Sequence, residues 1–98
     1  MEHITLKYYA PKLRHKDRYL ITHVSRYGES TNLAQEGTGI LYINRYDTVD
    51  QAKLAIEWYV GTQRKFTKED FVIVELNFNV DQFIVADASD PLPNGEED

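Results

Sequence analysis

The chain has 98 residues, a formal net charge of −5 and no cysteine. A chain of this length makes one domain with a single core. The lack of cysteine excludes disulfides, thiolate catalysis and cysteine-based zinc sites, and the negative charge disfavours bulk binding to nucleic acid. No apolar run has the length of a signal peptide or a membrane span, so we expect a cytoplasmic protein that does not contact a membrane.

The charge is divided by position along the chain. Residues 1–27 carry six Lys or Arg and two acidic residues, a net of +4, whereas residues 28–98 carry five basic and fourteen acidic residues, a net of −9. A basic front and an acidic rear present two different fields to partners. Four of the acids lie in residues 88–98, so the rest of the chain is close to −1.

The first half of the chain has the patterns typical of strands. Alternating or β-branched residues predict three strands, at residues 3–10, 19–27 and 40–46. Pro11 is expected to end the first of these strands. Residues 28–39 lie between the second and the third, hold three glycines among small polar residues, and are predicted to form a long loop.

A helix is predicted over residues 48–63. Thr48 begins a capping-box pattern in which Gln51 reaches back to the cap, and Gly61 lies in the last turn. Apolar residues recur at helical spacing on one side of this helix, and we expect them to be buried against the sheet. They are Val49, Ala52, Ile56, Tyr59 and Val60.

The rear of the chain predicts a turn, a hairpin and a tail. Residues 66–70 have the composition of a turn or a short 3₁₀ helix, and residues 71–80 form the strongest strand pattern, with Val72, Val74, Leu76, Phe78 and Val80 on one face. Asp81 and Gln82 suit a tight turn into a last strand at 83–87, so the two strands are expected to pair as a hairpin. Residues 88–98 are predicted to be a disordered acidic tail.

These elements predict an α+β fold in the order β-β-β-α-β-β. We expect one mostly antiparallel five-stranded sheet over residues 1–87 with the helix packed on one face, and helix burial against Val72, Val74, Leu76 and Phe78. A parallel β-α-β crossover from 40–46 to 71–80 stays open. A five-stranded sheet leaves two edges, so a homodimer is a further possibility.

Catalytic and metal-binding patterns are weak. The three histidines are His3, His15 and His23, and a metal site would need three or four converging ligands; His3 and His23 would meet only if the first two strands paired. Ser25 shares a strand face with His23 but lacks a nucleophile elbow. Gly37, Thr38 and Gly39 are expected to form a turn rather than a phosphate-binding loop. We therefore predict no enzyme activity, no cofactor and no metal.

Two surfaces are candidates for binding nucleic acid or protein. The basic, tyrosine-rich segment 7–18 interleaves cations and aromatic rings, as binders of single strands do. Its candidate contacts are Lys7, Tyr9, Lys12, Arg14, Lys16 and Arg18. The alternative for this segment is a core-facing strand whose charges are merely solvated.

The second surface is acidic and carries an aromatic anchor. Asp81 and Asp87 belong to six carboxylates in the last eighteen residues, where no basic residue occurs. They form either a surface that docks on a basic groove or a solubilising tail. Trp58 and Leu54 lie off the apolar stripe of the helix, where they either anchor a partner or pack under the 28–39 loop.

The sequence thus predicts a small non-enzymatic protein-binding module. A short, acidic, cysteine-free α+β chain without a catalytic motif resembles the small accessory proteins of phages and mobile elements, which implies an inhibitor of a host nucleic-acid-handling enzyme as the specific form of this function. The alternative is a nucleic-acid-binding regulator that uses residues 7–18.

Overall fold

The computed structural model describes residues 2–92, which form four strands and one α-helix. In chain order the elements are β1 (Glu2–Leu13), β2 (Leu20–Ser25), β3 (Gly28–Leu33), the 3₁₀ helix η1 (Ile40–Tyr42), α1 (Val49–Thr62), the 3₁₀ helix η2 (Lys68–Asp70) and β4 (Phe71–Gln82). The α+β class with antiparallel strands is confirmed.

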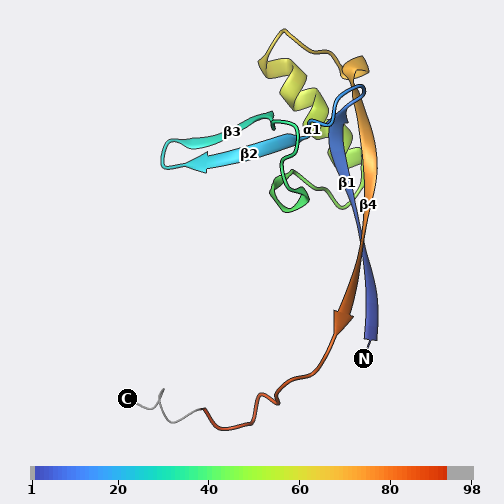
Figure 1. The fold of residues 1–98 in the computed structure, drawn as a ribbon. Helices are drawn as coiled ribbons and strands as arrows, with labels where there is room; N and C mark the ends of the chain where they lie inside the picture. Colours follow the sequence, from blue (N-terminus) through green and yellow to red (C-terminus); the bar gives the residue numbers. More distant parts are fainter. Residues whose placement is uncertain (1, 93–98) are drawn as a thin grey trace.

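The strands form two separate two-stranded sheets rather than one sheet of five. β1 pairs antiparallel with β4, and β2 pairs antiparallel with β3. Figure 1 shows that β1 and β4 form a long twisted ribbon that runs away from the helix, while the β2–β3 hairpin projects in another direction. The single five-stranded sheet and the parallel crossover are therefore wrong, because β4 pairs with β1 and only in antiparallel register.

Strand β1 continues through Pro11 instead of ending there. The backbone N–H and C=O of Tyr9 bond to Tyr46, at 2.8 and 2.9 Å, on the edge away from β4. Since backbone groups alternate in direction along a strand, the nitrogen of Pro11 also faces away from β4. Its missing N–H removes no bond to β4, and Pro11 and Ile73 still stand opposite each other.

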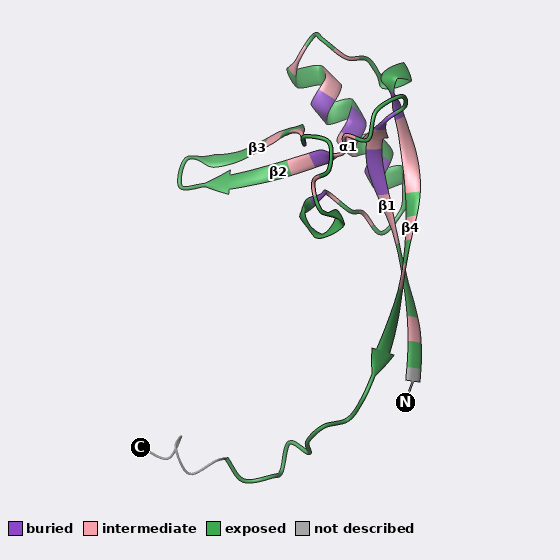
Figure 2. Cartoon of the chain, in the orientation of Figure 1, coloured by how far each residue is buried: buried purple, intermediate pink, exposed green. Residues whose placement is uncertain are grey.

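The first half of the predicted 28–39 loop is in fact strand β3. Residues 28–33 pair with β2, and the hydroxyls of Thr22 and Thr31 hydrogen-bond across the pair at 3.1 Å. Gly28, at a φ of 120°, makes the tight reversal that brings the two strands together. Polar composition hid this strand because both faces of most of the hairpin are exposed (Figure 2). The turn expected around Thr38 is present: its N–H bonds to the carbonyl of Gln35.

Residues 40–46 are not a strand, despite their β-branched and aromatic content. The short helix η1 occupies their first part. Beyond it the chain makes isolated backbone bonds, from Asn44 to Leu20 and between Tyr46 and Tyr9. The segment links the two sheets, and Ile43 is its buried residue.

The helix prediction is confirmed, with α1 beginning at Val49 after its cap. Thr48 Oγ1 accepts a hydrogen bond from the backbone N–H of Gln51 at 3.1 Å. The side chain of Gln51 accepts from the N–H of Asp47, one residue before the cap, at 3.0 Å. Of the expected apolar stripe, Ala52, Ile56 and Tyr59 are buried, Val60 is partly buried, and Val49 is exposed.

The core lies where α1 meets the inner end of the ribbon. Five residues from four elements form its buried cluster: Leu13, Leu20, Ile56, Tyr59 and Phe71. Phe71 makes edge-to-face contacts with Tyr59 at 5.9 Å and with Phe66 at 6.3 Å between ring centroids.

The helix covers the opposite face of β4 from the one expected. Phe71 and Ile73 pack in the core cluster, whereas Val72, Val74, Leu76, Phe78 and Val80 lie on the other face, where Val80 is exposed and the others are partly buried. This face continues across the ribbon onto Ile4, Leu6 and Tyr8 of β1, which stand opposite Val80, Phe78 and Leu76.

The expected hairpin between residues 71–80 and 83–87 is absent. Asp81 and Gln82 form no turn, because they extend β4 and stand opposite His3 and Glu2 of β1. Residues 83–87 are not a strand, and a turn follows in which Ser89 donates to the Asp87 carboxylate. Of the predicted tail 88–98, residues 93–98 lie outside the described residues. Residues 66–70 do contain the expected 3₁₀ helix, η2.

Replacing Thr48 with Ala should lower the free energy of unfolding by about 1 kcal/mol, because the Gln51 N–H loses its cap acceptor. Urea denaturation followed by circular dichroism measures this. Thr48→Ser keeps the hydroxyl and should unfold like the wild type. Equal losses in the two variants would contradict the cap.

Candidate functional site

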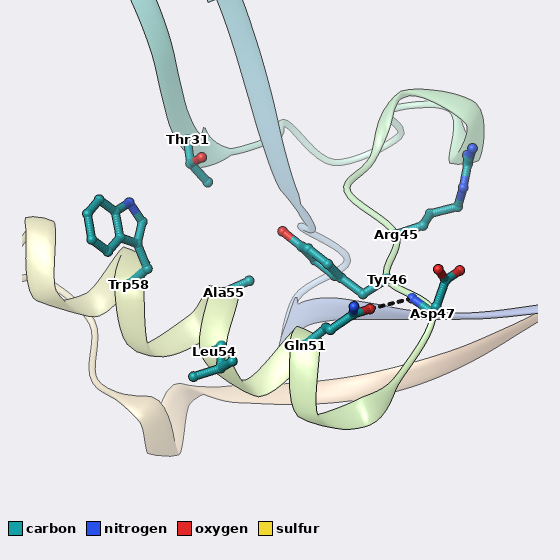
Figure 3. A pocket seen from close by; sticks show the side chains of 8 residues that line it. All are labelled: Thr31, Arg45, Tyr46, Asp47, Gln51, Leu54, Ala55 and Trp58. Atoms are coloured by element: carbon teal, nitrogen blue, oxygen red, sulfur yellow. Dashed lines mark hydrogen bonds between the residues drawn. The ribbon is translucent and has the colours of Figure 1, made fainter.

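A groove of about 470 Å³ lies beside α1. Thr31 of β3 forms one wall, the segment before the helix contributes Arg45, Tyr46 and Asp47, and α1 contributes Gln51, Leu54, Ala55 and Trp58. Figure 3 shows the Trp58 ring near Thr31 at one end and Arg45 and Asp47 toward the other. We refer to these eight residues as the helix groove.

The capping of α1 builds the polar end of the helix groove. The hydrogen bond from the Asp47 N–H to Gln51 holds both residues against the first turn of the helix (Figure 3). Asn44 donates to the Tyr46 hydroxyl at 3.5 Å, and burial of Tyr46 raises its pKa above the usual value for tyrosine. Tyr46 is therefore a neutral, half-buried wall at physiological pH, while Asp47 is exposed beside it.

Trp58 and Leu54 form the apolar part of the helix groove. Trp58 is 73% exposed and Leu54 is 64% exposed. The hairpin strand β3 lines the same groove through Thr31 but does not cover these two side chains. They lie on the outer side of α1, because the inner side is filled by Ala52, Ile56 and Tyr59.

The acidic candidates lie elsewhere. Asp81 is near the outer end of the ribbon, where its carboxylate contacts the His3 ring at 2.6 Å. Asp87 accepts hydrogen bonds from the backbone N–H and hydroxyl of Ser89, and these bonds lower its pKa. Neither residue lines the helix groove, so the four residues predicted to bind a partner divide into two groups.

Most of the basic candidates bond to neighbouring parts of the chain. Arg14 donates to the carbonyl oxygens of Glu69 and Phe71, at 3.1 and 3.3 Å, and Arg18 to those of Ala34 and Leu33, at 2.8 and 3.5 Å. These two guanidinium groups hold the 14–18 connection against η2 and the end of β3.

The remaining basic candidates do not gather on one surface. Lys7 pairs with Glu75 at 3.7 Å, Tyr9 reaches the same carboxylate at 3.5 Å, and Lys12 bonds to the Leu13 carbonyl. Lys16 is exposed and forms no ion pair among the described residues. Five of the six residues therefore serve local contacts.

The histidines do not converge either. His3 lies on β1 and His23 on β2, and these strands belong to different sheets, so the meeting that a metal site required does not occur. His23 and Ser25 stand on the exposed hairpin. Among residues 2–92, no group of three or more His, Asp or Glu side chains is placed to hold a metal ion.

The helical spacing predicted that Trp58 and Leu54 lie off the apolar stripe and left open whether they are exposed or packed under the 28–39 loop. It did not indicate Arg45, Tyr46 and Thr31 as their neighbours, and Gln51 was recognised only as part of the capping box. Residues three or four positions apart lie on the same side of a helix, so Gln51 in the cap and Leu54 and Ala55 in the next turn share one side. The capping motif was therefore the one sequence signal that could have located the polar end of the helix groove.

Comparisons with protein-family models, with curated proteins and with solved structures found no match to this chain. No helix in the described part of the chain is long and apolar enough to cross a bilayer.

Replacing Arg18 with Met should lower the free energy of unfolding by about 1–2 kcal/mol, because two backbone carbonyls lose a charged donor. Lys16→Met removes a neighbouring charge and should change stability by less than about 0.5 kcal/mol. Urea titrations of both variants make the comparison. Similar losses of stability in the two variants would show that the positive charge, rather than the carbonyl contacts, stabilises the fold.

Proposed function

We propose that this protein is a small non-enzymatic protein-binding module that holds its partner in the helix groove. The observation that carries the proposal is Trp58, which is the only tryptophan of the chain and is largely exposed in that groove. Exposed tryptophan in a concave surface is enriched among the residues that dominate protein interfaces, because its large ring loses contact with water when a partner binds.

The composition of the groove supports a protein partner. Trp58, Leu54 and Ala55 offer an apolar surface, and Arg45 and Asp47 place charges of both signs at the far end. An apolar centre with a polar rim is the usual arrangement of a protein interface. A partner segment would set an apolar side chain against Trp58 and bond its polar groups to Asp47, because the Arg45 guanidinium already donates to the Ile40 carbonyl at 3.3 Å.

The inhibitor form of this function has less support than binding itself. Docking on a basic groove of a nucleic-acid-handling enzyme relies on free carboxylates, yet Asp81 contacts His3 and Asp87 bonds to Ser89. We therefore propose the helix groove, rather than the acidic surface, as the primary contact. Nucleic-acid binding through residues 7–18 is not proposed, because Arg14 and Arg18 are engaged with backbone carbonyls.

Replacing Trp58 with Ala should weaken partner binding about 30-fold or more, which corresponds to the roughly 2 kcal/mol of a hot-spot residue. Stability should change by less than about 0.5 kcal/mol, since the ring is mostly exposed. The partner is isolated with the tagged wild-type protein from the native host and purified, and its dissociation constant is then measured by calorimetry.

Tyr27→Ala is the matched control, because Tyr27 is an aromatic residue that is 84% exposed at the tip of the β2–β3 hairpin, outside the helix groove. This variant should bind like the wild type. Equal weakening in both variants, or no weakening in Trp58→Ala, would overturn the groove assignment. Loss of binding at high salt without an effect of Trp58→Ala would instead favour the acidic surface. Capture of DNA or RNA alone would favour the nucleic-acid alternative.

A further inference from the structure

Strand β4 has a free edge along its outer half. The backbone N–H and C=O of Tyr9 point away from β4. Because these groups alternate in direction along a strand, the even-numbered residues of β1 bond to β4, and the register makes their partners on β4 even-numbered as well. The N–H and C=O groups of Asn77, Asn79 and Asp81 therefore point outward, where no strand pairs with them in the part of the chain that the structure describes. A long unpaired edge is a template for another strand.

The segment that follows β4 has the composition of a strand but no partner. Residues 83–86, the C-terminal arm, are Phe, Ile, Val and Ala, residue types of which the first three are strongly enriched in strands. Ile84 and Val85 are 97% and 92% exposed, and Phe83 is 66% exposed. The arm leaves the outer end of the ribbon and runs away from the other elements (Figures 1 and 2). Such apolar exposure in an extended segment indicates an interaction surface.

The free edge and the arm are complementary in two copies of the chain. When β4 and its arm run antiparallel to the same strand of a second copy, with the two-fold axis at Gln82, Val80 stands opposite Ile84 of the second copy. Asp81 then stands opposite Phe83 of the second copy, so no acidic side chain directly faces another. The apolar face of the ribbon that α1 does not cover is thereby extended by apolar side chains from the arm of the second copy.

The exposed area of the chain is sufficient for such an interface. The chain exposes 7915 Å², whereas a compact monomer of 11.4 kDa exposes about 5,800 Å². The excess of about 2,100 Å² is that of the whole extended chain, of which a standard stable interface would bury roughly 800 Å² per partner. A two-stranded ribbon is also marginal by itself, whereas three strands with an apolar face are sufficient for independent stability.

We propose that this protein is a homodimer in which the C-terminal arm of each copy pairs antiparallel with the free outer edge of β4 in the other copy, so that each ribbon becomes a three-stranded sheet in the order β1–β4–arm. The pairing is isologous, so it closes at two chains and removes the β4 edge. The strand pairing between residues 71–80 and 83–87 that the sequence indicates is then made between chains rather than within one.

The full-length protein should have twice the mass of one 11.4 kDa chain in light scattering after size exclusion. Ile84→Asp should weaken dimerisation at least about tenfold, because a buried Ile contributes at least that factor. This variant should leave the monomer folded, since Ile84 packs on nothing within the chain. Leu92→Asp, in an apolar residue beyond the arm that is 69% exposed, should leave the dimer unchanged.

The register has its own test, which the absence of cysteine makes simple. Gln82 would face its own copy across the axis as a non-hydrogen-bonded pair, with Cα atoms about 4.5 Å apart, within the range of a disulfide. Gln82→Cys should therefore form a disulfide-linked dimer in oxidising buffer, at monomer concentrations where Ser89→Cys forms none.

A wild-type protein that stays monomeric at high concentration would overturn the proposal. So would a dimer that persists in Ile84→Asp, and so would equal cross-linking of Gln82→Cys and Ser89→Cys. These outcomes are independent of the helix groove, because Trp58→Ala should dimerise like the wild type. Failure of partner binding and failure of dimerisation are thus measured separately.

Discussion

The pairing of β1 with β4 is the interaction on which the rest of the structure depends. It joins the first and the last strands, and Leu13 opposite Phe71 brings together two members of the buried cluster. Without this pair, Ile56 and Tyr59 of α1 would lose Leu13 and Phe71, and Leu20 alone would remain of their buried partners in the cluster. The chain must therefore close a loop of nearly sixty residues before its core exists, a closure whose entropic cost rises only slowly with loop length.

Side-chain bonds to backbone carbonyls hold the smaller elements to this ribbon. Arg14 bonds across to η2 and the start of β4, and Arg18 to the end of β3. Each guanidinium satisfies carbonyls that have no partner in a sheet, which suits its fixed fork of donors. The basic residues at the front of the chain therefore serve largely to hold the fold together. The surfaces that remain free for a function are the helix groove, the β4 edge and the C-terminal arm.

Local signals in the sequence predicted local structure well. Thr48 and Gln51 located the start of α1, and residues 66–70 were recognised as a turn with a 3₁₀ helix, because each depends on contacts within a few residues. Pairing was not predictable in this way. The partner of β4 lies more than fifty residues away, the strand β3 is too polar to be recognised by alternation, and residues 40–46 have strand composition but only isolated backbone partners. The same distinction applies to the helix groove. Helical spacing located Trp58, but its neighbours across the groove could not be predicted from local patterns.

The arm at residues 83–86 shows how composition and structure can disagree for a physical reason. Its side chains favour a strand, but a strand requires a neighbour, and β1 already occupies one edge of β4 up to Gln82. Within one chain the arm cannot turn back along the other edge, because Asp81 and Gln82 are extended in β4 and cannot also form the turn. The same pairing is sterically open to a second chain, which approaches that edge without a turn. An apolar, β-branched segment beside an unpaired edge is costly in a monomer, and two-fold pairing resolves both features in one interface.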